Sequence, residues 1–280
     1  FRTHWTTINI IILNALKTES TQNITLSSLT FPASLNSILL TGWKPKLEDV
    51  KSNILLQPRK YSTDAIMPIH LMGYPCEMDE IIENNKNKII IEDACESTGT
   101  TYKGKKVGSF GTAGAFSFYM SHSLGVGEGG IITTNNYELS ERIRSLKNHG
   151  REKNMFLEFK HNLIGYNMKI TEFMSALIYS EIKNLDKIIK KRYLNVKYLN
   201  DNITNNKLIL PKALPNVSYL GYLLGVKKEQ DREMILSRLG KEGIEVRKMF
   251  PCLINQVAYR KMFNDKLHPN ANYFEKHYFY

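Results

Sequence analysis

The sequence predicts an α/β protein with a mostly parallel, doubly wound sheet and a smaller C-terminal α/β domain. In the first part of the chain, short apolar runs of strand length alternate with stretches of helical period, as in βαβ units. A long, charged helical stretch follows, and a second set of strand-like and helix-like segments lies beyond it. We therefore expect a large domain over residues 1–185 and a small one over residues 186–280.

The first elements are predicted from apolar periodicity and from the residues that interrupt it. Ile8–Lys17 predicts a helix, and Thr6 or Thr7 is available as its N-terminal cap. Asn23–Thr30 predicts a short strand, and Phe31–Thr41 predicts a helix that a glycine ends.

Strands and helices continue to alternate after these elements. Ala65–Leu71 is an apolar run of strand length, although Pro68 argues against a regular central strand. Glu77–Lys86 predicts a helix, and Lys88–Glu92, with three successive isoleucines, predicts a buried strand.

Two further strands, Gly114–Tyr119 and Gly130–Thr134, flank a glycine-rich turn, and Tyr137–Asn148 follows at helical period. Asp93 and His122 each lie just past the end of a predicted strand. Active sites of doubly wound sheets gather at the carboxyl ends of strands, so both residues are candidate site residues.

The C-terminal part begins with a helix capped by Thr171, and charged helical sequence continues to about Tyr198. Beyond a polar break we expect a strand, a helix and a short strand, at Tyr219–Val226, Asp231–Lys241 and Gly243–Arg247. These segments predict the smaller domain.

Composition narrows the class of protein. The net charge of +11 fits an anionic partner, but the basic residues are dispersed, which favours a lysine-rich solvated surface over a nucleic-acid interface. Apolar runs are too short for a membrane span and no export signal is recognisable, so we expect a cytoplasmic protein. The 3 cysteines are widely spaced, without the pairs typical of zinc or iron–sulfur sites, and we expect no metal.

Several polar residues fit a cofactor pocket, each beside a structural alternative. A carboxylate such as Asp93 at a buried strand end could pair with a protonated ring nitrogen, as pyridoxal enzymes require, or form a structural ion pair. Ser117, with Thr6 and Thr7 at a helix start, could bind a phosphate or act as helix caps. The glycines of residues 127–130 permit tight turns and close approach of a ligand.

Six motifs in a fixed order are more specific than any of these residues alone. They span residues 92–97, 102–111, 116–118, 127–130, 144–150 and 165–172. In that order they resemble the DegT family of vitamin-B6-dependent sugar-nucleotide aminotransferases and dehydratases. The resemblance covers roughly residues 5 to 275 and implies the type I aminotransferase fold, with pyridoxal or pyridoxamine 5'-phosphate as cofactor and a nucleotide sugar as substrate.

The resemblance also implies roles around the cofactor ring. Asp93 would bind the pyridine nitrogen, Glu96 would lie near the ring hydroxyl, and Phe31 would stack on the ring.

The phosphate of the cofactor has its own implied partners. Ser117 matches a phosphate ligand, while Thr6 and Thr7 fall near the family's phosphate turn. Asn167 matches a residue that reaches the phosphate of the neighbouring subunit, which implies a homodimer with shared active sites.

One departure from the family concerns catalysis. His122 stands where the family has its Schiff-base lysine, and an imidazole cannot bind the cofactor covalently. Imidazole can still move protons at the cofactor's reactive carbon. A histidine here resembles the branch of 3-dehydratases that act on nucleotide-linked 4-keto-6-deoxy sugars, so we expect such an activity in lipopolysaccharide or other surface-glycan synthesis.

A second departure concerns the ends of the chain. His4-Trp5-Thr6-Thr7 replaces the family's Ser-Gly-Ser/Thr phosphate turn, and the chain looks truncated at both ends relative to the family. Two alternatives therefore stay open: an aminotransferase that uses another lysine, such as Lys160 or Lys169, and a non-catalytic remnant or binding protein of the same fold.

Overall fold

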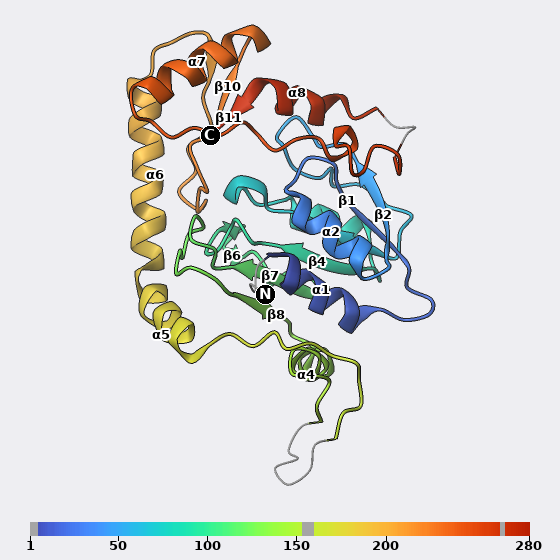
Figure 1. Cartoon of the computed structure of the whole chain (residues 1–280). Helices are drawn as coiled ribbons and strands as arrows, with labels where there is room; N and C mark the ends of the chain where they lie inside the picture. Colours follow the sequence, from blue (N-terminus) through green and yellow to red (C-terminus); the bar gives the residue numbers. More distant parts are fainter. Residues whose placement is uncertain (1–4, 153–159, 264–266) are drawn as a thin grey trace.

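A six-stranded sheet forms the centre of the larger part of the molecule. The computed structural model describes residues 5–152, 160–263 and 267–280. The strand order is β2-β1-β3-β4-β7-β8, and all pairs are parallel except that of β7 with β8, which is antiparallel. The strands are β1 (Asn23–Ser27), β2 (Lys44–Glu48), β3 (Ala65–Met67), β4 (Ile89–Asp93), β7 (Ala113–Ser117) and β8 (Gly130–Thr133). This confirms the predicted mostly parallel α/β sheet (Figure 1).

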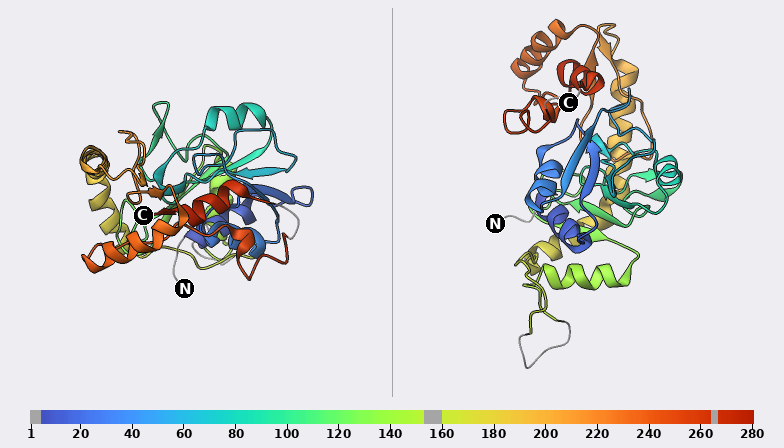
Figure 2. Two further views of the ribbon diagram at one scale, coloured as in Figure 1. Left: turned by 90° about the horizontal axis from the view of Figure 1, so that it is seen from above. Right: turned by 90° about the vertical axis from the view of Figure 1, so that its right-hand side faces the viewer.

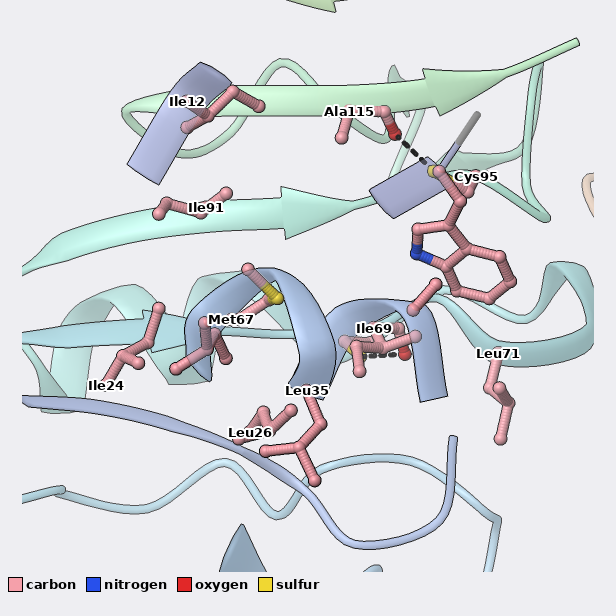
Figure 3. Packing of buried hydrophobic residues seen from close by; sticks show 14 of the residues in the cluster. Ile12, Ile24, Leu26, Leu35, Met67, Ile69, Leu71, Ile91, Cys95 and Ala115 are labelled. Carbon is pink, nitrogen blue, oxygen red and sulfur yellow. Dashed lines mark hydrogen bonds between the residues drawn. The ribbon is translucent and has the colours of Figure 1, made fainter. Parts of the chain in front are cut away.

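Helices of the first half pack against this sheet and around one hydrophobic core. They are α1 (Trp5–Leu16), α2 (Pro32–Leu40), α3 (Met78–Asn84) and α4 (Tyr137–Leu146). Helix α1 contacts α2, α4, β7 and β8, so it lies across the sheet with buried side chains along most of its length. Figure 3 shows the core gathering side chains from α1, α2 and the central strands, among them Ile12, Leu35, Ile24, Met67 and Ile91.

The C-terminal part has its own small sheet. Its antiparallel strands, in the order β11-β10-β9, are Tyr278–Phe279, Leu224–Val226 and Leu208–Ile209. Its helices are α5 (Glu172–Glu181), α6 (Leu185–Asn202), α7 (Glu229–Lys241) and α8 (Pro269–His277). Figures 1 and 2 show α6 running beside the central sheet toward α7, with α7 and α8 beyond the large sheet.

The remaining elements are short. They are the hairpin β5 (Thr101–Tyr102) and β6 (Lys105–Lys106), and the 3-10 turns η1 (Leu71–Gly73), η2 (Ile182–Asn184) and η3 (Leu253–Asn255). Over the described residues, no helix combines the length and the apolar character that a membrane span needs. All three cysteines are buried and free.

Most predicted elements are confirmed with shifted ends, and the shifts have local causes. Strand β3 stops at Met67, before Pro68, because proline has no N–H for the ladder. Thr6 and Thr7 were expected as caps but lie inside the first turn of α1. Thr171 does cap α5, since its Oγ1 accepts a hydrogen bond from the Met174 amide.

The tail differs more from the prediction. The strand expected over Tyr219–Val226 is reduced to Leu224–Val226, and the backbone at Tyr219 has a positive φ of 35°. Gly243–Arg247 was expected to be a strand, and this is wrong. Gly243 has a φ of 76° and donates to the Gly240 carbonyl, so the segment begins with the tight turn that follows α7. Its last residue, Arg247, exchanges backbone hydrogen bonds with Tyr280, but no strand forms over 243–247.

The glycine-rich turn has a packing role that the sequence did not indicate. A Cβ built on Gly130 would lie 1.8 Å from Ile8 Cδ1 of α1 and 2.4 Å from the Phe116 carbonyl oxygen. Gly129, with a φ of 137°, similarly faces Ile170. The close approach at these glycines is therefore to helix α1 and to Ile170, and it fixes where α1 lies on the sheet.

Candidate active site

A cavity of about 410 Å³ lies at the carboxyl ends of β4 and β7, where the C-terminal part meets the central sheet. It draws its lining from both halves of the chain. The lining includes Thr6, Phe31, Glu96, Ser117, His122 and Arg247. The structure thus brings five of the predicted site residues to one hollow.

Asp93 is the last residue of β4 and is 1% exposed. Its Oδ2 accepts hydrogen bonds from Trp5 Nε1 at 2.5 Å, Ser34 Oγ at 2.8 Å and Asn9 Nδ2 at 3.0 Å. Its Oδ1 accepts a longer one, 3.3 Å, from the Cys95 amide. Because a buried carboxylate is tolerated only when donors surround it, these contacts explain how a charge can sit at this strand end and why α1 and α2 converge there.

The indole of Trp5 connects Asp93 with two other predicted site residues. It stacks on Phe31 with ring centroids 5.5 Å apart and an interplanar angle of 28°. Its edge-to-face contact with His122 has a centroid distance of 6.2 Å and an angle of 71°. The Trp5 indole, an aromatic heterocycle with one N–H, therefore contacts Asp93, Phe31 and His122 at the same time.

His122 is held in place by the turn that follows β7. It is 7% exposed, its amide donates to the Tyr119 carbonyl at 2.8 Å, and its Nδ1 lies 3.3 Å from the Ser117 carbonyl oxygen. An Nδ1–H donated to that oxygen favours the tautomer whose basic nitrogen is Nε2. The imidazole therefore has a defined orientation at the cavity wall.

Arg192 of α6 secures the same turn from the C-terminal side. Its guanidinium donates to the carbonyl oxygens of Tyr219 at 2.6 Å, Ser218 at 3.1 Å and His122 at 3.4 Å. It also donates to the Ser123 hydroxyl at 3.3 Å. One side chain thus joins the imidazole-bearing turn to the segment that leads into β10.

Glu96 presents an unusual carboxyl to the cavity. It is 3% exposed, and its Oε2 accepts a hydrogen bond from the Met72 amide at 2.7 Å. Burial raises the pKa of Glu96 to about 8; the Met72 amide opposes this rise and the Asp93 carboxylate adds to it. At neutral pH the carboxyl is mostly protonated and can donate a hydrogen bond into the site.

Sequence reasoning missed Glu92, which supports the site from the opposite face of β4. Its carboxylate accepts from the amides of Gly108, Phe110 and Gly111 at 2.7, 2.6 and 2.7 Å, and His70 Nε2 lies 3.1 Å away. Burial alone would raise its pKa, but the His70 contact and the loop amides lower it below the usual range. Two adjacent acids inside an apolar strand were the available signal, since alternation places one on each face.

The predicted phosphate ligands are divided by the structure. Ser117 and Thr6 line the 410 Å³ cavity, and Ser117 Oγ accepts from the Tyr119 amide at 3.3 Å. Thr7 lines a different cavity of about 270 Å³ beside α4. Asn167 is exposed, and its backbone forms an isolated antiparallel β-bridge with Asn148. It does not line the active-site cavity. The roles of all four stay predictions.

The lysines considered as alternatives to His122 lie elsewhere. Lys169 Nζ donates to Asn148 Oδ1 at 2.9 Å, and Lys160 Nζ lies 3.0 Å from Glu152 Oε2. Within the part of the chain that the structure describes, the lining of the 410 Å³ cavity contains no lysine.

Sugar-nucleotide enzymes are among the proteins whose sequences are similar to this chain. A sequence profile of the DegT/DnrJ/EryC1/StrS aminotransferase family matches residues 5–279. GDP-perosamine synthase of Caulobacter vibrioides is 31% identical over 258 residues, covering 86% of this chain and 68% of the relative. GDP-4-keto-6-deoxy-D-mannose 3-dehydratase of Escherichia coli O55:H7 is 30% identical over 239 residues, 77% of this chain and 62% of the relative.

Solved structures confirm the predicted type I aminotransferase fold. The E. coli GDP-4-keto-6-deoxy-D-mannose-3-dehydratase with bound hydrated PLP has a TM-score of 0.88 and 25% identity, covering 99% of this chain and 81% of that one. A ColD variant, in which lysine replaces a histidine and asparagine replaces the serine just before it, has a TM-score of 0.89 and 24% identity, with coverages of 99% and 83%.

Proposed function

Because the chain belongs to the DegT/DnrJ/EryC1/StrS aminotransferase family, whose members modify sugar nucleotides with pyridoxal phosphate, we propose that it is a 3-dehydratase. Its substrate would be a nucleotide-linked 4-keto-6-deoxy sugar, and its pathway the synthesis of a surface glycan such as lipopolysaccharide. We place this activity in the cytoplasm, where nucleotide sugars are made.

The observation that carries the proposal is the composition of the cavity wall. His122 lines this cavity and is in edge contact with the Trp5 indole, which donates a hydrogen bond to Asp93. None of the described lining residues is a lysine. Covalent attachment of the cofactor needs a primary amine, so this wall favours non-covalent binding.

The residues around Asp93 fit the cofactor ring. Asp93 and Phe31 already hold one flat heterocycle through its N–H and its face, which is the pair of contacts that a pyridinium ring requires. In the proposed complex Asp93 would accept from the ring N–H and Phe31 would cover the ring. Protonated Glu96 would donate to the ring hydroxyl, and the hydroxyls of Ser117 and Thr6 would bind the phosphate.

When bound, pyridoxamine phosphate would supply a primary amine, which condenses with the 4-keto group with release of water, and a ring that withdraws electrons. His122 would remove a proton from the cofactor carbon that carries this amine. The resulting imidazolium would hand that proton to the hydroxyl at position 3, which leaves as water. Arg247, at the cavity wall, would pair with the phosphates of the nucleotide.

The absorbance spectrum with pyridoxamine phosphate tests the proposal. We expect a near-ultraviolet band that borohydride leaves unchanged, and loss of water from a 4-keto-6-deoxy sugar nucleotide. His122→Asn should abolish dehydration and keep cofactor binding. His149→Asn is a matched control, because His149 is exposed, lies outside the cavity lining and has a φ of 61° that asparagine tolerates. A yellow form that borohydride bleaches would reject the dehydratase.

The alternative reaction is amino transfer, which the family description and the GDP-perosamine synthase relative favour. It predicts the bleachable form and the formation of an amino sugar. A non-catalytic protein of this fold predicts neither turnover nor cofactor binding.

We also propose that the active form is a homodimer with shared sites, since exposed Asn167 is available to a second subunit. The separate six-stranded and three-stranded sheets support a division into domains at residues 1–185 and 186–280.

A further inference from the structure

Trp5 occupies the place in which the cofactor ring is expected, and this residue has no role in the function proposed above. We propose that the Trp5 indole is a built-in ligand of this pocket, which competes with the cofactor ring for Asp93 and Phe31. The ring can then enter only after the indole has swung away. This inference rests on the cofactor pocket of the proposed function, but not on the reaction catalysed there.

The first argument concerns the hydrogen bond. Trp5 Nε1 lies 2.5 Å from Asp93 Oδ2, and Ser34 and Asn9 donate to the same oxygen. With three donors on Oδ2, that atom has no position left for the N–H of a pyridinium ring. The indole is also a flat aromatic with a single N–H, so it satisfies the acidic anchor as the cofactor would.

The second argument concerns the ring faces. The Trp5 and Phe31 rings are stacked at 5.5 Å, and stacked aromatic pairs have centroids about 4.5–7 Å apart. A third flat ring has no space between them. The opposite contact, to His122, is edge-to-face at 6.2 Å, so the indole fills the distance between stacking residue and imidazole. Trp5 is 6% exposed, so the indole is buried at the wall of the 410 Å³ cavity, which it also lines.

The third argument concerns how the indole reaches this position and how it can leave. Ile8, one turn further along α1, packs against Gly130, and this contact holds the start of the helix over the pocket. Trp5 is the first residue of α1. Rotation of its side chain changes only side-chain torsions, so it leaves the backbone hydrogen bonds of α1 intact. The indole can therefore exchange with a ligand while α1 stays docked.

Competition of this kind lowers the apparent affinity for the cofactor by the fraction of molecules whose pocket is open. Trp5→Gly removes the competing ring. We expect this variant to bind pyridoxamine phosphate at least about tenfold more tightly than the unmodified chain, equivalent to about 1.4 kcal/mol. Trp5→Phe, which keeps a ring but loses the N–H, should fall between the two.

Equilibrium dialysis with pyridoxamine phosphate measures these affinities, and far-ultraviolet circular dichroism checks that each variant is folded. Equal affinities of the unmodified chain and folded Trp5→Gly would overturn the inference. So would a lack of binding by all three proteins, which would also remove the cofactor from the proposed function. A tenfold difference without any dehydration would reject only the dehydratase.

A second measurement does not depend on the stability of the glycine variant. The chain has 2 tryptophans, and Trp43→Phe leaves Trp5 as the only indole emitter. Because the cofactor should expel a buried indole into water, we expect saturating pyridoxamine phosphate to shift the Trp5 emission to longer wavelength. Inorganic phosphate at the same concentration is the control. Bound cofactor with an unshifted emission maximum would show that Trp5 does not occupy the ring position.

Discussion

Glu96→Gln should change how the stability of the protein depends on pH. The Glu96 carboxyl has a pKa of about 8 in the folded protein against an ordinary value of 4.5, because it is buried. Below pH 4.5 the carboxyl is protonated in both the folded and the unfolded chain. Between these two values the folded chain binds the extra proton, so stability falls as the pH rises.

The size of the effect follows from the pKa difference. At about 1.4 kcal/mol for each pKa unit, complete ionisation of Glu96 removes about 4–5 kcal/mol of stability between pH 4.5 and 8. Glutamine keeps an acceptor for the Met72 amide, which lies 2.7 Å from Glu96 Oε2, and has no charge to lose. The variant should therefore resemble the parent at pH 5 and exceed it in stability at pH 9.

Urea unfolding of both proteins at pH values from 5 to 9 measures this difference. Every other titrating group is common to the two chains, so the change in their stability difference isolates Glu96. Two curves that stay parallel over this range would refute the reasoning, since they would show that Glu96 has an ordinary pKa. Convergence at high pH would contradict the predicted sign.

Four further substitutions test the anchor, the packing and a helix cap. Asp93→Asn should leave the chain folded but lower its unfolding free energy by about 1–3 kcal/mol in urea, because an amide nitrogen would face donors; unchanged stability would contradict the three contacts. Gly130→Ala should destabilise by about 1–3 kcal/mol through its clash with Ile8, whereas Gly240→Ala, in α7 with open space around it, should raise stability by about 0.5–1 kcal/mol. Thr171→Ala should lower the melting temperature by removing a cap worth about 1 kcal/mol, and an unchanged melting curve would count against that hydrogen bond.

Most strands of the central sheet could be predicted because each coincides with a short apolar run in the sequence. Lys88–Glu92 closely matches β4, since consecutive isoleucines are typical of a strand buried on both faces. Strand β2 was missed because Lys44–Glu48 is polar and contains Pro45, so its sequence lacks a strand pattern. It becomes a strand because it pairs with β1 at the edge of the sheet, where one side needs no partner. Tertiary contacts thus decided the element that local propensity did not favour.

The site was predictable where the order of motifs located a residue, and less so where chain geometry decides. Glu96, Ser117 and His122 do meet at one cavity. Thr7 faces another cavity because successive residues of a helix point in different directions, about 100° apart. The contact of Trp5 with Asp93 joins residues 88 positions apart, and nothing in either segment alone indicates it.

The hydrogen bonds of the Arg192 guanidinium limit which segments of this protein can be exchanged in an engineered chimera. It is a side chain of α6, yet it binds the carbonyl of the residue proposed as the base and the carbonyls that lead into β10. A chimera that took its C-terminal half from another sugar-nucleotide enzyme would keep His122 but lose the Arg192 hydrogen bonds that hold its turn. Such chimeras should retain this arginine, because without it the turn that carries His122 loses these hydrogen bonds.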